Sequence, residues 1–140
     1  MPSPISWGCL LLIACRAPED ALTARCTDEM LATGDPQHCQ VAVSVLNGPK
    51  RIALDTSASY HTANVHGRFR LAKGKAEVVV EDSTGPVLRT TVTAGTESTL
   101  DGKVKLSRPI GATKHFFTLV VEPAAGAERL TGTVDYDSRD

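Results

Sequence analysis

This sequence has few aromatic residues and almost no net charge. Aromatic side chains make up 4% of its 140 residues, so the hydrophobic core must come mainly from Val, Leu, Ile and Ala, with Phe69 and Phe117 adding bulk. The formal net charge is only −1 at pH 7. Domains that bind nucleic acid usually have a strongly basic face, so we expect no nucleic-acid partner. The length suits a single domain with one core.

Catalytic motifs are missing as well. The sequence has no G-x-S-x-G, the turn that a nucleophile-elbow hydrolase places between a strand and a helix. Ser98 lies in a turn-rich segment without a neighbouring histidine, so we interpret it as a turn serine. His61 and His66 lack the spacing of a zincin motif and fall in or beside a polar loop, which favours solvated histidines. The sequence therefore predicts no catalytic residues, no metal site and no cofactor.

Long hydrophobic runs are confined to the N-terminus. The run from Trp7 to Ala14 is too short to span a bilayer, which needs roughly 20 residues, and no later run is long enough. Its end, Leu12–Cys15, resembles the lipobox of bacterial lipoproteins, in which a Leu three positions before the cysteine and a small residue just before it precede the lipidated residue. The resemblance implies a signal peptide over 1–14 and lipidation of Cys15.

The residue after the predicted lipidation site bears on location. In enteric bacteria an Asp directly after the lipidated cysteine favours retention in the inner membrane, whereas this chain has Arg16. The resemblance therefore implies a lipid-anchored protein of the bacterial outer membrane, with the membrane and an envelope protein as partners. Two alternatives stay open, a secreted protein cleaved nearby and a structural N-terminus, because no positively charged side chain precedes the apolar run.

The other cysteines fit an exported protein. Cys9 would leave with the signal peptide, so Cys26 and Cys39 remain as one pair in an oxidising compartment and are predicted to form a disulfide. An alternative is a metal site that combines both cysteines with His38, although the chain has no C-x-x-C motif.

The segment between these cysteines has helix signals. Thr27 can serve as an N-cap, and Gly34 with Pro36 supplies a stop. We predict one helical turn, stapled by the disulfide, within 26–39. The polar stretch 15–25 before it is expected to be a tether.

From Gln40 onward the apolar residues alternate with polar ones, which is typical of half-buried strands. We expect one hairpin between 41–45 and 52–54 and another between 76–81 and 87–92. The remaining strands are expected near 68–71, 103–106, 115–121 and 130–136, with further short segments between turns.

About eight short strands and no long helix predict an all-β fold, a single small antiparallel β-sandwich over 40–140. The run 67–136 resembles the jelly-roll-like sandwiches attached to many exported bacterial proteins.

One group of basic residues is a candidate binding surface. The side chains of Arg68, Arg70, Lys73 and Lys75 are expected on the exposed side of one hairpin. Such a patch could meet anionic lipid, lipopolysaccharide or a polyanionic glycan. The alternative is that these charges protect an edge strand against association.

These observations favour a non-catalytic, lipid-anchored accessory or protein-interaction module of the bacterial envelope. A carbohydrate- or cell-wall-binding module is the first alternative, although few aromatic residues, namely Tyr60, Phe116 and Tyr136, are available to stack on sugars. The second alternative is a hydrolase of unrecognised type, in which His61, His66 or His115 meets acids across strands.

Overall fold

The computed structural model describes residues 20–26, 37–55, 61–107 and 115–139, with the side chains of 138 and 139 left aside. The described residues form nine strands and no helix, which confirms the predicted all-β sandwich. The strands are β1 (Thr23–Cys26), β2 (Gln37–Val45), β3 (Lys50–Asp55), β4 (Thr62–Lys73), β5 (Lys75–Asp82), β6 (Gly85–Thr93), β7 (Ser98–Lys105), β8 (Phe116–Pro123) and β9 (Glu128–Arg139).

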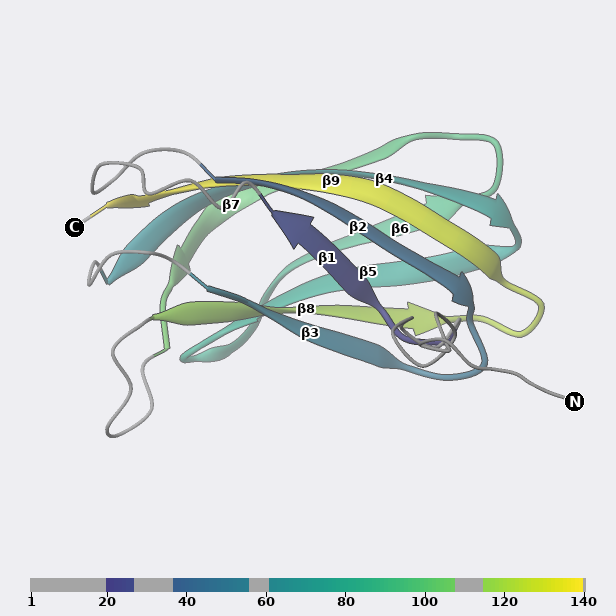
Figure 1. Ribbon diagram of the computed structural model, residues 1–140, viewed down its shortest axis with the longest axis horizontal. Coiled ribbons are helices and arrows are strands. Elements are labelled where there is room, and N and C mark those ends of the chain that lie inside the picture. The colour runs from purple at the N-terminus through teal and green to yellow at the C-terminus, as the bar shows by residue number, and fades with distance from the viewer. Residues whose placement is uncertain (1–19, 27–36, 56–60, 108–114, 140) are drawn as a thin grey trace, which may run out of the picture.

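Two antiparallel sheets pack face to face (Figure 1). One has five strands in the order β1-β2-β9-β4-β7, and the other has four in the order β3-β8-β5-β6. Figure 1 shows β2, β9 and β4 as one layer along the top of the view, with β3 and β8 along the bottom. Alternate residues of each strand point into the core between the sheets, as a period of two requires. The largest fully buried side chains include Leu54, Phe69, Phe117, Leu119 and Leu130.

Phe69 of β4 is accommodated by glycines on the inner face of the five-stranded sheet. Gly132 is its register partner on β9, and a Cβ atom built there would lie 2.5 Å from Cδ1 of Phe69 and 2.4 Å from the carbonyl oxygen of Arg68. A Cβ on Gly67 would lie 2.7 Å from Cε2 of the same ring. The ring therefore occupies the space that side chains at both positions would fill.

The structure corrects two predicted strand pairings. The hairpin expected between β2 and β3 is wrong, because β2 pairs with β1 and β9, whereas β3 pairs with β8 in the other sheet. The hairpin expected to carry the basic patch is also wrong, because β4 and β5 lie in different sheets. Gly74 makes the corner between them at a φ of 84°, where a Cβ would lie 2.8 Å from the Cα of Ala127. The hairpin between β5 and β6 is confirmed.

The N-terminal boundary of the sandwich also differs from the prediction. Residues Thr23–Cys26 belong to the five-stranded sheet rather than to a tether, and β2 already begins at Gln37. Cys26 and Cys39 are register partners on β1 and β2 and form the predicted disulfide. The predicted helical turn between them lies mostly outside the described residues.

Hydrogen bonds of Asp82 and Tyr136 connect the two sheets. Asp82 at the end of β5 accepts hydrogen bonds from the backbone N–H of Thr84, at 2.7 Å, and of Lys105 on β7, at 2.8 Å. Tyr136 of β9 donates its hydroxyl to the carbonyl oxygen of Asp55 on β3, at 2.6 Å. The ring of Tyr136 also packs edge-on against Phe117, with 4.9 Å between the centroids. Burial, and then the charge of Asp55, raise the pKa of Tyr136 above its ordinary value.

Ion pairs cover the outer face of the four-stranded sheet. Val79 and Val120 are register partners there and are only 2% exposed. Arg89 is paired with Glu77, at 2.5 Å, and Arg51 with Glu81. Arg51 and Arg89 flank the two valines in the same row, so their aliphatic stems can shield the valines from water. This face of the sandwich is therefore already occupied by its own side chains.

Candidate functional site

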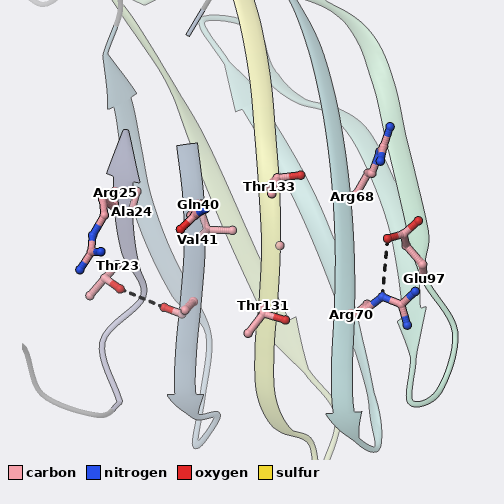
Figure 2. Close-up of a pocket in the computed structure, with 12 residues that line it drawn as sticks. Thr23, Ala24, Arg25, Gln40, Val41, Arg68, Arg70, Glu97, Thr131 and Thr133 are labelled. Atoms are coloured by element: carbon pink, nitrogen blue, oxygen red, sulfur yellow. Dashed lines mark hydrogen bonds and ion pairs between the residues drawn. The ribbon is translucent and has the colours of Figure 1, made fainter. Parts of the chain in front are cut away.

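The outer face of the five-stranded sheet carries an open groove of about 900 Å³ over β1, β2, β9 and β4. The inner positions of these strands hold aliphatic residues of the core, so the intervening polar residues face outward. Figure 2 shows these outward side chains standing on four neighbouring strands. We call this hollow the sheet groove, and it is lined by Thr23, Ala24, Arg25, Gln40, Val41, Ala42, Arg68, Arg70, Glu97, Thr131, Gly132 and Thr133.

Strand register organises the sheet groove into rows that cross the strands. The central row runs Arg25, Gln40, Thr133, Arg68, one residue from each of β1, β2, β9 and β4. It thus has a cation at each end and hydrogen-bonding side chains between them (Figure 2). Neighbouring strands lie about 4.8 Å apart, so three spacings separate the backbones of the two arginines by roughly 14 Å.

The cations of the sheet groove differ in their partners. Arg70 is paired with Glu97, with Nε 3.6 Å from Oε2. Neither Arg25 nor Arg68 forms an ion pair with an acidic residue in the part of the chain that the structure describes. Two arginine charges therefore remain available to a ligand.

Histidines and aspartates alternate in the next row along the same face. His38 of β2, Asp135 of β9, His66 of β4 and Asp101 of β7 are successive register partners. The Nδ1 atom of His38 is hydrogen-bonded to Asp135, and that of His66 to Asp101. All four side chains are about half exposed. This His–Asp row borders the sheet groove on one side.

Arg68 connects the His–Asp row to the sheet groove. Its Nε atom lies 3.5 Å from Nε2 of His66, a long hydrogen bond. His66 thus lies between the carboxylate of Asp101 and the guanidinium of Arg68.

A smaller hollow of about 470 Å³ lies beside this histidine on β4, β7 and β9. Its charged lining residues, apart from His66, are Asp101, Lys103, Asp135 and Asp137. Among the described residues, no group of three or more His, Cys, Asp or Glu side chains is placed to hold a metal ion.

The predicted basic patch is divided by the fold. Arg68 and Arg70 line the sheet groove, whereas Lys73 lies at the end of β4, 3.8 Å from Glu128. Lys75 begins β5 in the other sheet, so the corner at Gly74 separates it from the three basic residues on β4. Cys15, the predicted lipidation site, lies outside the described residues.

The expectation that His66 lies in or beside a loop is wrong, because His66 lies within β4 and is hydrogen-bonded to Asp101. His115 is buried, at 2% exposure, and 5.5 Å separates the centroids of its ring and that of His61. The aromatic residues expected to be available to a sugar are also placed differently. Tyr136 is buried and cannot stack on a sugar, and Phe116 is half-buried. Tyr60 lies outside the described residues.

Ser98 is the first residue of β7 rather than a turn residue. Its hydroxyl donates to the carbonyl oxygen of Thr91 on β6, at 2.8 Å, and so links the two strands beside the turn. The hydrolase alternative did correctly expect that His66 would meet an acid across strands.

Sequence reasoning missed Arg25, Gln40, Thr131 and Thr133 as groove residues. Each occupies an outward position of a strand, which the alternation could have indicated. Which strands stand side by side, and therefore which polar residues share a row, is decided by the pairing of β9 with both β2 and β4.

We found no family model that matches the chain and no curated protein that is similar to it. Several solved structures align with most of the chain. The N-terminal cellulose-binding domain of β-1,4-glucanase C from Cellulomonas fimi does so over 86% of this chain and 90% of its own, with 18% identity and a TM-score of 0.40. A structure of the disulfide-linked pili of Bacillus endospore appendages aligns over 81% of this chain and 99% of its own, with 15% identity and a TM-score of 0.40.

A carbohydrate-binding module from Cellvibrio mixtus lichenase 5A, in complex with cellotriose, aligns over 86% of this chain and 88% of its own, with 15% identity and a TM-score of 0.36. TM-scores this low assign neither a family nor a function. The function of this chain therefore has to be argued from its own residues.

Proposed function

We propose that this protein is a non-catalytic binding module and that the sheet groove is its binding face. The observation that carries the proposal is the open hollow of about 900 Å³ on the outer face of the five-stranded sheet, lined mainly by polar side chains of neighbouring strands. The outer face of the four-stranded sheet is instead covered by Arg51, Arg89 and their carboxylate partners. A ligand that uses the sheet groove meets two arginines that have no acidic partner among the described residues. It also meets the outward-facing hydroxyls of Thr131 and Thr133.

Photo-crosslinking tests the choice of face. A photo-crosslinking amino acid in place of Thr131, in the sheet groove, should capture a ligand from native envelope extracts. The same replacement at Thr91, exposed on β6 of the other sheet, is the matched control. Adducts that form from Thr131 and not from Thr91 support the proposal. Adducts that form only from Thr91 overturn it.

We also propose that the module is anchored to the bacterial outer membrane through lipid on Cys15 and meets an envelope protein there. The support is the lipobox-like segment Leu12–Cys15 together with the disulfide between Cys26 and Cys39, which suits an oxidising compartment. The described residues include no helix that is long and apolar enough to cross a membrane.

The intact mass of the protein from its native membrane tests the anchor. A chain that begins at Cys15 and is heavier by acyl groups is the expected result. An unlipidated chain that retains Met1 overturns the anchor and leaves the binding face to be tested separately.

A carbohydrate ligand is the second candidate. The central row of the sheet groove offers the amide of Gln40 and the hydroxyl of Thr133, groups that can donate and accept hydrogen bonds with sugar hydroxyls. Binding of polysaccharides that is lost in Gln40→Ala favours this candidate over a protein partner. Polysaccharide binding that is unchanged in Gln40→Ala counts against a carbohydrate ligand in the sheet groove.

A further inference from the structure

We propose that the ligand of the sheet groove is a linear acidic polysaccharide, which lies across the strands between Arg25 and Arg68. The inference rests on the proposed function, because it names the class of ligand for the same face. The central row places one arginine at each end, roughly 14 Å apart, with Gln40 and Thr133 between them. A chain that carries carboxylates with hydroxyl-bearing sugars between them matches this order of groups.

The charges of the row favour an acidic ligand. Guanidinium groups bind carboxylates through charge-assisted hydrogen bonds, which are stronger than neutral ones. Glu97 is the only acid that lines the sheet groove among the described residues, and it is already paired with Arg70. Arg25 and Arg68 therefore face the ligand without a competing carboxylate from the groove itself.

The side chains of the sheet groove disfavour a neutral sugar chain held by stacking. None of the described residues that line it is aromatic, and Tyr136 is buried below the sheet. Without a ring to cover a sugar face, affinity has to come from charge and hydrogen bonds. Arginine at both ends of the row supplies the charge, and the amide and hydroxyl between them supply the hydrogen bonds.

The His–Asp row disfavours a broad anionic surface such as a membrane. Asp135 and Asp101 stand beside the central row on the same face, so a flat negative surface laid on the sheet would meet both carboxylates. A single chain that follows the central row avoids them. The arrangement of charges thus favours a linear anionic chain over a flat anionic surface.

Binding of polygalacturonate oligomers, measured by isothermal titration calorimetry on the folded chain, tests the proposal. We expect Arg25→Gln and Arg68→Gln each to weaken binding about tenfold, which corresponds to the loss of one charge-assisted contact. Arg51→Gln removes the same charge from the outer face of the four-stranded sheet and is the matched control. It should leave the affinity unchanged, and thermal melts of each variant verify folding.

Each other outcome overturns the acidic-polysaccharide inference. An equal loss of affinity in Arg51→Gln would show that binding depends on net charge rather than on contacts with the central row. Equal binding of neutral dextran oligomers, lost in Gln40→Ala, would refute an acidic ligand and leave the sheet groove as the binding face. Absence of binding to either polymer, with crosslinks from Thr131 to an envelope protein, would refute the polysaccharide but retain the proposed function. Binding of anionic vesicles alone would refute a linear ligand.

Discussion

Arg68 and His66 lie on the same face of β4, with Nε of the arginine 3.5 Å from Nε2 of the imidazole. The other imidazole nitrogen is hydrogen-bonded to Asp101. His66 therefore lies between the guanidinium of Arg68 and the carboxylate of Asp101. We expect this contact to position Arg68 beside the sheet groove.

We predict that His66→Ala weakens the binding of polygalacturonate roughly threefold, which corresponds to the loss of one modest hydrogen bond. The substitution removes the side chain that contacts Nε of Arg68 and links this arginine to Asp101. Titration calorimetry with polygalacturonate measures the effect.

The matched control is His38→Ala, because His38 makes the same kind of contact with Asp135 but lies two strands away from Arg68. It should leave the affinity for polygalacturonate unchanged. A loss of affinity in His38→Ala alone would contradict the role assigned to His66.

Gly132→Ala should destabilise the sandwich by about 1 to 3 kcal/mol, the usual cost of overpacking. The new Cβ would lie 2.4 Å from the backbone oxygen of Arg68 and 2.5 Å from Phe69, so backbone has to shift. Gly48→Ala is the control, because a Cβ there has no neighbour within 4 Å. Urea denaturation measures the free energy of unfolding of both variants. Equal stability of the two would contradict the conclusion that the ring of Phe69 fills the space beside Gly132.

Asp82→Asn should lower the stability at pH 7 by about 1 kcal/mol, because neutral hydrogen bonds replace charge-assisted ones and solvent screens the exposed carboxylate. Burial raises the pKa of Asp82, but its hydrogen bonds from Thr84 and the backbone of Lys105 and the charge of Lys105 outweigh it, so the pKa is lowered.

A lowered pKa stabilises the fold above the unfolded value of about 3.9, and this contribution is lost as the pH falls through the folded pKa. The difference between wild type and Asp82→Asn should therefore shrink in urea titrations as the pH falls below the ordinary pKa of an aspartate, and disappear once Asp82 is protonated in the folded state. A difference that does not shrink with falling pH would assign the effect to lost packing instead.

Removal of the disulfide should both destabilise the fold and weaken ligand binding. The Cys26→Ala, Cys39→Ala variant loses a cross-link between residues 13 apart, which corresponds to about 3 kcal/mol in the loop-entropy account. β1 is an edge strand that pairs only with β2, so its release also removes Arg25 from the sheet groove. Urea denaturation measures the first effect and calorimetry with polygalacturonate the second. Unchanged binding in the double variant would contradict a role for β1 in the site.

Several features follow from local sequence alone. Alternation in 76–81 and 87–92, with a dense turn signal between them, defines the hairpin of β5 and β6 because its partners are adjacent in the chain. The pairing of Cys26 with Cys39 was expected because these two cysteines are the ones that lie outside the lipobox-like N-terminal run. The burial of Phe69 and Phe117 follows from the scarcity of other bulky residues. The all-β class of the fold follows from the repeated alternation of apolar and polar residues.

Only the tertiary structure decides which strands stand side by side. Alternation shows that a residue faces outward, but it does not show to which sheet the residue belongs. The predicted hairpin of β2 and β3 was therefore wrong, because these strands are close in sequence but lie in different sheets. The corner at Gly74 likewise divides the predicted basic patch between the two sheets. Arg25, Gln40, Thr133 and Arg68 form one row because β9, the last strand in the chain, pairs with both β2 and β4. Such long-range pairing depends on how the two inner faces pack together, and no local pattern of residues encodes it.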